Sequence, residues 1–248
     1  MARVLVPLPD RDFDVTEVAV PWHLLVKAGH EVVFATERGG TAPVCDPLLL
    51  TGVLFGKLGA AIEAVASYRG LERAPEFLQP VAWGDVDPAA YGALLLPGGH
   101  APGMRQYLGS EALQAKVAAF WALRRPVAAI CHGVLVLARA RDPRTGKSVL
   151  AGRRTTCLPK YMERSAWLLT FWKYGRYYRT YDAYVEDEVR AALDEPRGEF
   201  VRGPRTLSAR GTADDHSAAF VVEDGPYVSA RWPGDAYLFT HRLLARLG

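Results

Sequence analysis

The sequence predicts an α/β fold in which a mostly parallel β-sheet is covered by helices on both faces. Short apolar runs, such as residues 93–97 (ALLLP) and 126–130 (PVAAI), alternate with segments of helical pattern along the chain. The runs are continuously apolar, which is typical of parallel strands buried on both faces. Half of the 248 residues are apolar, so the chain can bury the large core that such a sheet requires.

The first strand and the first helix follow from local signals. Residues 3–7 (RVLVP) have the pattern of a short buried strand, and residues 15–28 have that of a helix. Asp14 is suited to be the N-cap of this helix, and Gly29 is suited to end it. Because Pro21 lies inside it, we expect the helix to kink or to begin anew there.

The remaining elements continue the alternation. Residues 30–36 predict the next strand, followed by the two apolar runs given above. Near the C-terminus, residues 220–223 and 227–231 flank an Asp-Gly pair, which predicts a β-hairpin. Residues 235–247 then predict a closing helix.

Two segments depart from this alternation, and we interpret them as insertions into a single domain that spans residues 1–248. Residues 47–80 have a helical pattern. Residues 155–202 are less ordinary, because nine aromatic side chains, interleaved with Lys and Arg, lie between Tyr161 and Tyr184. No repeat, low-complexity tract or linker marks a second domain, so we expect the insertions to form a helical, aromatic-rich cap over one end of the sheet.

Composition excludes several classes of protein. With 30 Lys and Arg against 27 Asp and Glu, the formal net charge of +3 gives no reason to expect a nucleic-acid partner. No apolar stretch is long enough to span a bilayer, and residues 1–10 lack the pattern of a signal peptide. The three cysteines, Cys45, Cys131 and Cys157, are too few for a disulfide framework. We therefore expect a cytoplasmic protein with free thiols.

The segment Cys131-His132-Gly133 joins an apolar strand to a helical pattern. This order predicts a nucleophile elbow, in which a strained turn lifts the nucleophile out of the sheet. Gly133 is small enough for the helix to begin close to the strand. The dipole of that helix should favour the thiolate of Cys131 over the thiol. The alternative is an unreactive cysteine buried in the core.

A second strand ends in Pro97-Gly98-Gly99-His100. Paired glycines let the backbone approach a ligand, and their amides, with the amide of His132, could donate to a developing oxyanion. Both glycine turns follow the carboxyl ends of strands, which is the edge where open α/β sheets bind ligands. We therefore count Gly98, Gly99, His100 and Gly133 as candidate oxyanion or substrate-binding residues.

Glu17 has two interpretations. Asp14 and Glu17 match the spacing of a capping box, in which the glutamate would bond to the backbone of the N-cap residue. The functional interpretation instead places the carboxyl group of Glu17 beside the sulfur of Cys131. It would be protonated there and would donate a hydrogen bond to the thiolate.

Three segments carry a resemblance to a known family: residues 13–22 (FDVTEVAVPW), 97–100 (PGGH) and 129–133 (AICHG). They resemble the ThiJ/PfpI (DJ-one) superfamily, of class I glutamine-amidotransferase-like fold, and within it the glyoxalase III and heat-shock chaperone branch. The resemblance implies a flavodoxin-like sheet, an elbow cysteine and an acid that touches this cysteine. Cys131 and Glu17 match these two positions.

In that branch a further acidic residue follows the Cys-His pair, and Glu163, 32 residues past Cys131, matches it. The resemblance implies that Glu163 holds the His132 imidazole in one tautomer. It also implies an enzyme in which Cys131 adds to an aldehyde such as methylglyoxal and His132 moves a proton through an enediol. The Gly99 and His132 amides would hold the oxygen, and hydrolysis would release a hydroxy acid such as lactate.

We expect no metal and no organic cofactor, because the sequence shows no cluster with metal-ligand spacing. The expected partner is a small carbonyl or acyl substrate, and a homodimer is a further expectation. Two alternatives stay open. The same residues could form a thioester in a cysteine peptidase or amidase, or Cys131 could be oxidised in a stress chaperone or redox sensor. An oriented His132–Glu163 pair would favour an enzyme.

Four aromatic residues fall at helical spacing and can share one helix face. They are Trp167, Phe171, Trp172 and Tyr174. This face could pack on the sheet, form a dimer interface, or line a pocket over Cys131.

Overall fold

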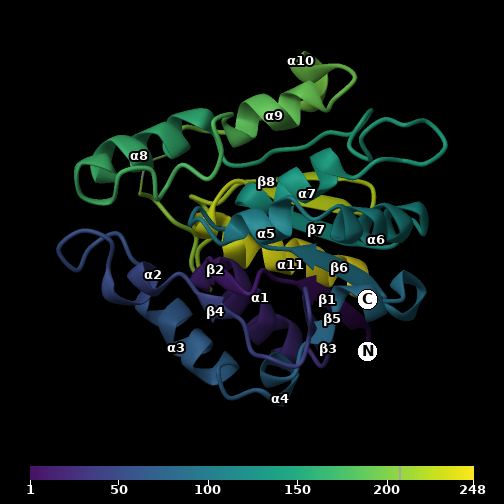
Figure 1. Ribbon diagram of the computed structural model, residues 1–248, viewed down its shortest axis with the longest axis horizontal. Coiled ribbons are helices and arrows are strands. Elements are labelled where there is room, and N and C mark those ends of the chain that lie inside the picture. The colour runs from purple at the N-terminus through teal and green to yellow at the C-terminus, as the bar shows by residue number, and fades with distance from the viewer. Residues whose placement is uncertain (207) are drawn as a thin grey trace.

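A seven-stranded sheet of order β5-β3-β1-β6-β7-β9-β8 forms the centre of the computed structural model, which describes residues 1–206 and 208–248 (Figure 1). Neighbouring strands pair in parallel except for β8, which is antiparallel to β9. The strands of this sheet are β1 (Arg3–Pro7), β3 (Glu31–Thr36), β5 (Val81–Ala82), β6 (Ala93–Leu96), β7 (Val127–Ile130), β8 (Val221–Asp224) and β9 (Tyr227–Ala230). The predicted α/β class with a mostly parallel sheet is confirmed. A separate parallel pair joins β2 (Arg11–Phe13) to β4 (Val44–Cys45).

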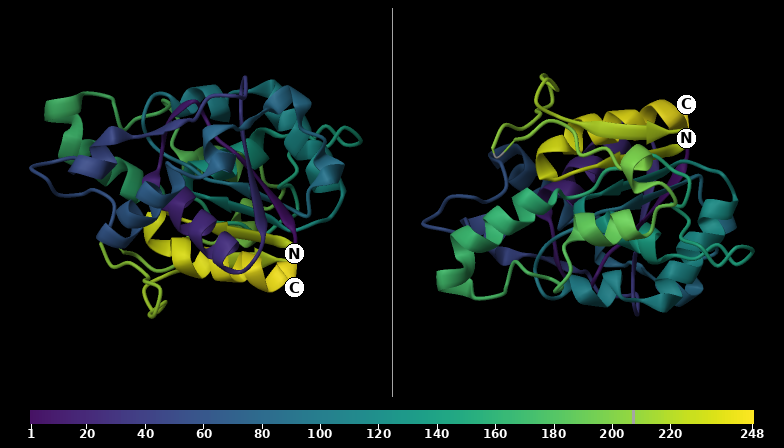
Figure 2. Two further views of the ribbon diagram at one scale, coloured as in Figure 1. Left: turned by 90° about the horizontal axis from the view of Figure 1, so that it is seen from below. Right: turned by 90° about the horizontal axis from the view of Figure 1, so that it is seen from above.

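Helices cover both faces of the sheet, as the two turned views show (Figure 2). One layer contains the first and the last helix of the chain: it consists of α1 (Val15–Lys27), α3 (Ile62–Leu71) and α11 (Ala236–Leu247). Those on the other face are α5 (Met104–Leu108), α6 (Glu111–Ala122) and α7 (Val134–Arg139). The remaining helices are α2 (Pro47–Thr51), α4 (Pro75–Leu78), α8 (Lys160–Tyr174), α9 (Val185–Ala191) and α10 (Pro196–Glu199).

Helix α1 confirms its predicted caps. The Asp14 side chain accepts hydrogen bonds from the backbone N–H groups of Thr16 (2.8 Å) and Glu17 (3.1 Å). Gly29 follows the helix with a φ of 81°, a conformation that glycine adopts without strain. Pro21 lies within an unbroken helix, so the expectation that a new helix begins there is wrong.

Strand register brings two loops to one edge of the sheet. β6 and β7 pair from Leu94 with Val127 to Leu96 with Ala129, so both strands end at the same level. The loop that begins at Pro97 and the turn that begins at Cys131 are therefore neighbours. This is the ligand-binding edge expected of an open parallel sheet.

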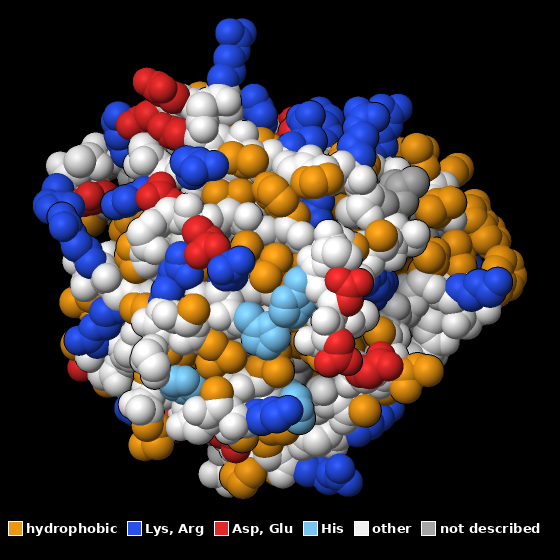
Figure 3. All heavy atoms as spheres, turned by 180° about the vertical axis from the view of Figure 1, so that it is seen from behind, with side chains coloured by type: hydrophobic (Ala, Val, Ile, Leu, Met, Phe, Trp, Pro, Cys, Tyr) orange, Lys and Arg blue, Asp and Glu red, His pale blue; other side chains and the backbone are white. Residues whose placement is uncertain are grey.

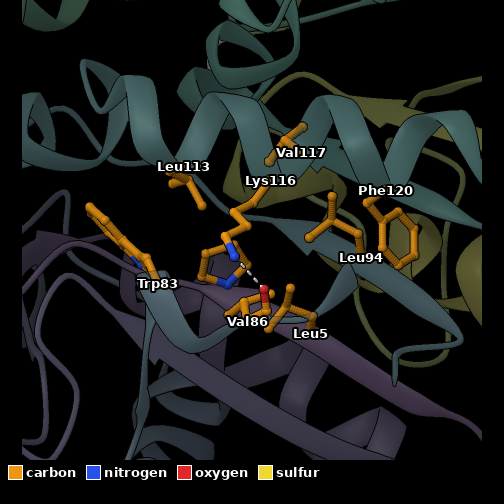
Figure 4. Close-up of a pocket in the computed structure, with 9 residues that line it drawn as sticks. Leu5, Trp83, Val86, Leu94, Leu113, Lys116, Val117 and Phe120 are labelled. Carbon is orange, nitrogen blue, oxygen red and sulfur yellow. Dashed lines mark hydrogen bonds between the residues drawn. The ribbon is translucent and has the colours of Figure 1, made fainter. Parts of the chain in front are cut away.

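Where α6 packs on β1 and β6, the side chains leave almost no space. A cavity of only about 10 Å³ lies between β1, β6 and α6, which is room for about one water molecule (Figure 4). Lys116 of α6 reaches across it, and its Nζ donates to the carbonyl oxygens of Val86 (2.7 Å) and Gly84 (3.0 Å). This cavity is too small to bind a ligand.

Helices α8 and α9 of the second predicted insertion cap each other. Glu163 of α8 accepts a hydrogen bond from the N–H of Val185, the first residue of α9 (3.0 Å). Glu186 of α9 accepts one from the N–H of Lys160, the first residue of α8 (2.9 Å). Each carboxylate thus satisfies a donor that a helix N-terminus leaves open. Among the described residues, no helix has the length and apolar character needed to cross a membrane.

The aromatic face of α8 does not belong to the core. Phe171 and Trp172 are 49% and 59% exposed, so the interpretation that this face packs on the sheet is wrong for both. Trp172 stacks instead on Phe55 of the first insertion, with ring centroids 6.3 Å apart. In Figure 1, α8 and the segment that follows α2 lie at the same end of the molecule.

Candidate active site

Cys131 lies directly after β7, at the start of a tight turn that leads into α7. Its φ of 57° falls in the left-handed region, which is strained for a residue with a Cβ atom. The side chains of Cys131 and His132 are both buried. The strand, strained cysteine and helix thus have the geometry expected of a nucleophile elbow.

Two glycines allow the neighbouring loops to interlock. A Cβ atom on Gly133 would lie 2.2 Å from the carbonyl oxygen of Leu96, and one on Gly98 would lie 2.7 Å from the backbone nitrogen of His132. Both distances are shorter than any non-bonded contact allows, and the opposing atoms belong to the backbone. Glycine is therefore required on both sides of this contact, which fixes the elbow against the end of β6.

The carboxyl group of Glu17 lies inside this arrangement. Its Oε2 accepts a hydrogen bond from the N–H of Gly98 (2.7 Å), so the capping-box interpretation of Glu17 is wrong. Burial raises the pKa of Glu17 well above its usual value, and the nearby Asp14 adds to this rise. Both effects favour the neutral acid form of Glu17 over the carboxylate. Its Oε1 has no hydrogen-bond partner among the described residues, and Glu17 lies close enough to Cys131 for each group to affect the pKa of the other.

Burial raises the pKa of the Cys131 thiol, which is the opposite of the direction expected from the helix dipole. A hydrogen bond from the backbone N–H of His132 to the sulfur counters part of this rise. The resting state is therefore a thiol. A nucleophilic sulfur requires a base that removes its proton as the substrate arrives.

His132 is placed to be that base. Its Nδ1 lies 3.5 Å from Sγ of Cys131, and its Nε2 lies 3.4 Å from Oγ1 of Thr180. Burial lowers the pKa of His132 well below its usual value, so the imidazole is neutral and carries one proton.

Thr180 decides which nitrogen of His132 carries that proton. The Thr180 hydroxyl donates its only proton to the carbonyl oxygen of His100 (2.6 Å). Toward Nε2 of His132 the same oxygen can then act only as an acceptor, which selects the tautomer with hydrogen on Nε2. Nδ1 is left with a lone pair that faces the thiol of Cys131.

Glu163 does not contact His132 as expected. Its two carboxylate oxygens accept from Nη1 of Arg179 (3.1 Å) and from the N–H of Val185 (3.0 Å). Burial raises the pKa of Glu163 to about 7, and these two bonds limit the rise. Since Arg179 is adjacent to Thr180 in the chain, Glu163 holds the loop that carries the hydroxyl rather than the imidazole itself.

Some of the candidate oxyanion donors are already used within the protein, and others are free in the part of the chain that the structure describes. The N–H of Gly98 is used by Glu17, so it is not available to a substrate. The N–H of Gly99 has no acceptor among the described residues, which leaves it free to donate. The backbone N–H of His132 lies close enough to the sulfur of Cys131 to counter part of the rise in its pKa.

The ring of His100 lies 4.7 Å from the ring of His132, measured between centroids. One ligand atom from each of His100, Cys131 and His132 lies within 4.8 Å of the other two. Two imidazoles and a thiol are a donor set that suits thiophilic ions such as Zn²⁺. Spacing in the sequence gave no indication of this cluster, because His100 comes from a different loop.

A cavity of about 550 Å³ opens beside the elbow. Its wall includes His100 and, from the start of α1, Asp14 and Thr16, while much of the remainder comes from the two insertions. The sequence analysis offered a pocket wall as one role of the aromatic face, but none of Trp167, Phe171, Trp172 and Tyr174 is among the residues that line this cavity. It did not predict the role of Thr180. A lone threonine within an insertion carries no signal of its own.

Comparisons with known proteins show which family and fold the chain resembles. A family model described as ThiJ/PfpI family-like matches residues 8–204. A deglycase of Pyrococcus abyssi is 27% identical over 245 residues, covering 99% of both chains. Glyoxalase 3 of Candida albicans is 25% identical over 221 residues, covering 83% of this chain and 88% of the relative. The crystal structure of glyoxalase III from Candida albicans has the same fold, with a TM-score of 0.71, 19% identity and coverage of 98% and 96%.

Proposed function

The chain belongs to the ThiJ/PfpI-like family, and from this premise we propose that it is a cofactor-independent enzyme that converts small reactive carbonyl compounds, such as methylglyoxal, to hydroxy acids. The observation that carries the proposal is the pair formed by Cys131 on its strained turn and Nδ1 of His132, 3.5 Å from the sulfur. Relatives named glyoxalase 3 and deglycase support the substrate class.

The reaction begins with the thiol. Nδ1 of His132 takes the proton of Cys131 as the sulfur attacks the aldehyde carbon, which forms a hemithioacetal. The N–H groups of Gly99 and His132 donate to the aldehyde oxygen. Glu17 stays neutral and hydrogen-bonds to the sulfur, so no second negative charge builds up beside the thiolate.

His132 then gives its proton to the alkoxide oxygen, and the neutral imidazole takes the proton of the former aldehyde carbon and passes it to the adjacent carbon. This transfer runs through an enediol and turns the hemithioacetal into a thioester of Cys131. Water hydrolyses the thioester and restores the thiol. The balance is R–CO–CHO + H₂O → R–CH(OH)–COOH, with no oxidant, reductant or metal required.

The test is turnover of methylglyoxal without glutathione, followed as formation of lactate. The wild type should be active, Cys131→Ala inactive, and His132→Ala nearly inactive. Cys45→Ala and Cys157→Ala are matched controls, because both cysteines are buried away from the elbow and should keep full activity. Activity that survives in Cys131→Ala would refute the proposal.

A deglycase reaction is a second candidate, favoured by the relatives that carry this name. In that case the same thiol would act on a carbonyl group already bound to an amine or a thiol, and water would release it. The two reactions differ in the species that the enzyme consumes. Rates can be measured while the concentration of the amine or thiol adduct is held constant and that of free methylglyoxal is varied. If the first proposal holds, the rate should depend on the concentration of the free aldehyde.

A further inference from the structure

We propose that the 550 Å³ cavity is a specificity pocket that binds a branched aliphatic or aromatic group of the carbonyl compound, so that the preferred substrates are α-oxoaldehydes much bulkier than methylglyoxal. This rests on the proposed function for the chemistry at Cys131. The binding of an apolar group in the cavity stands on separate observations.

The first observation is size. Pockets that bind drug-sized molecules measure about 300–1,000 Å³, and this cavity lies well inside that range. Methylglyoxal has three carbons. It would leave most of the space to water, which gains little from contact with apolar walls.

The second observation is the chemistry of the wall. Apolar side chains from both insertions line the cavity: Leu49 and Val53 from the first, and Met162, Ala166 and Leu169 from the second. These side chains offer no hydrogen bonds, so they select for an apolar group.

The charged residues of the cavity wall lie near one another. Arg210 is close enough to Asp14 to oppose the rise in pKa that burial causes there, and it lies over the ring of Trp232. Asp14 is the N-cap of α1, whose first turn carries Glu17 beside Cys131. The two charged residues Asp14 and Arg210 therefore lie near the start of α1, the helix that carries Glu17.

The third observation is the route to the sulfur. His100 lines the cavity, and its imidazole also lies within 4.8 Å of the reactive atoms of Cys131 and His132. Cys131 itself is fully buried. A narrow carbonyl end can therefore approach the sulfur past His100, while a bulky group stays in the cavity. This arrangement fits a molecule with a small reactive head and an apolar body.

The mouth of the cavity continues the apolar surface. Leu58, Leu168 and Leu169 line the cavity and are also 55%, 47% and 55% exposed. Figure 3 shows apolar side chains gathered at the end of the molecule where α8 lies. An apolar compound thus meets matching side chains from the surface inward.

The first experiment compares substrates. Isobutylglyoxal and benzylglyoxal should exceed methylglyoxal in kcat/KM by about 10-fold or more, because each additional buried methylene adds transfer free energy. Ala166→Phe fills the cavity from α8 and should remove this preference. Ala122→Phe, the same change at an exposed site on α6, should alter neither rate.

The second experiment measures binding without turnover. Isothermal titration with 2-hydroxy-4-methylpentanoate and with lactate, the corresponding products, should show binding of the bulkier acid only, and Ala166→Phe should abolish it. If no aldehyde is turned over but this binding pattern holds, the proposed function fails and the assignment of the cavity stands. If methylglyoxal is turned over with no preference for bulk and no such binding, the assignment of the cavity is refuted and the proposed function stands.

Discussion

Thr180→Val isolates the contact that we infer to orient the catalytic base. Valine keeps nearly the same shape but has no hydroxyl. The change removes the donor to the His100 carbonyl oxygen at 2.6 Å and the acceptor for Nε2 of His132 at 3.4 Å. Thr180 does not touch the sulfur, so it acts as a positioning residue through His132.

The magnitude follows from those two bonds. A buried polar group that loses its partner costs about 1–3 kcal/mol, so the free energy of unfolding should fall by about that amount. If the Nε2–H tautomer of His132 is destabilised by the same amount, fewer molecules carry the lone pair at Nδ1 that accepts the thiol proton. At 1.4 kcal/mol for each factor of ten, kcat/KM should fall by about 5-fold to about 100-fold.

Two measurements check this prediction. Steady-state kinetics with an α-oxoaldehyde gives kcat/KM for wild type, Thr180→Val and the control Thr180→Ser, which keeps the hydroxyl and should stay near wild type. Nitrogen-15 chemical shifts of the His132 ring report the tautomer directly, and a purely structural role of Thr180 would not move them. Unchanged kcat/KM together with an unchanged tautomer in Thr180→Val would refute the role of Thr180.

Four further predictions follow from the same site. Glu163→Gln should lose less activity than Thr180→Val, because Glu163 does not contact the imidazole; a complete loss of turnover would show a direct role. The rate of Cys131 alkylation by iodoacetamide, measured by mass spectrometry, should still rise about tenfold between pH 8 and pH 9. Burial raises the pKa of the thiol, so the fraction of reactive thiolate still increases in this range. A rate that is already constant by pH 8 would contradict this. Gly133→Ala should lower the free energy of unfolding by about 1–3 kcal/mol or more in urea titrations, whereas Gly84→Ala, with open space around the new methyl group, should have little effect; equal effects would argue against the backbone clash. Zn²⁺ should inhibit turnover reversibly, and binding of Zn²⁺ measured by titration should weaken about 10-fold or more in His100→Ala; equal affinity would exclude His100 as a ligand.

The sequence was sufficient for those parts of the structure that depend on local chemistry. Continuous apolar runs gave β1, β6 and β7, and the Asp14 cap and Gly29 stop gave the limits of α1 to within a residue. Cys131 was recognisable because a strand, a small turn and a helix follow one another directly. Each of these signals lies within a few residues of the feature that it predicts.

Contacts between residues far apart in the sequence could not be predicted from such local signals. The family resemblance suggested Glu163 as the partner of His132, but its two oxygens accept instead from Arg179 at 3.1 Å and from the N–H of Val185 at the start of α9 at 3.0 Å. The hydroxyl that takes its place belongs to Thr180, 48 residues from His132. Helical periodicity likewise placed Trp172 on an apolar face, but it could not show that this face meets Phe55 and solvent rather than the sheet.

The mutual capping of α8 and α9 ties the alignment of the proposed base, His132, to a helix pair outside the central sheet. Thr180 lies in the connection between these helices, so the His132 tautomer is selected only while both carboxylates, Glu163 and Glu186, keep the pair docked. Local opening of such a unit requires less free energy than unfolding of the sheet. Heating should therefore abolish the proposed activity while the sheet is still folded. In hydrogen–deuterium exchange, the amides of Lys160 and Val185 should lose protection at the same temperature as activity is lost.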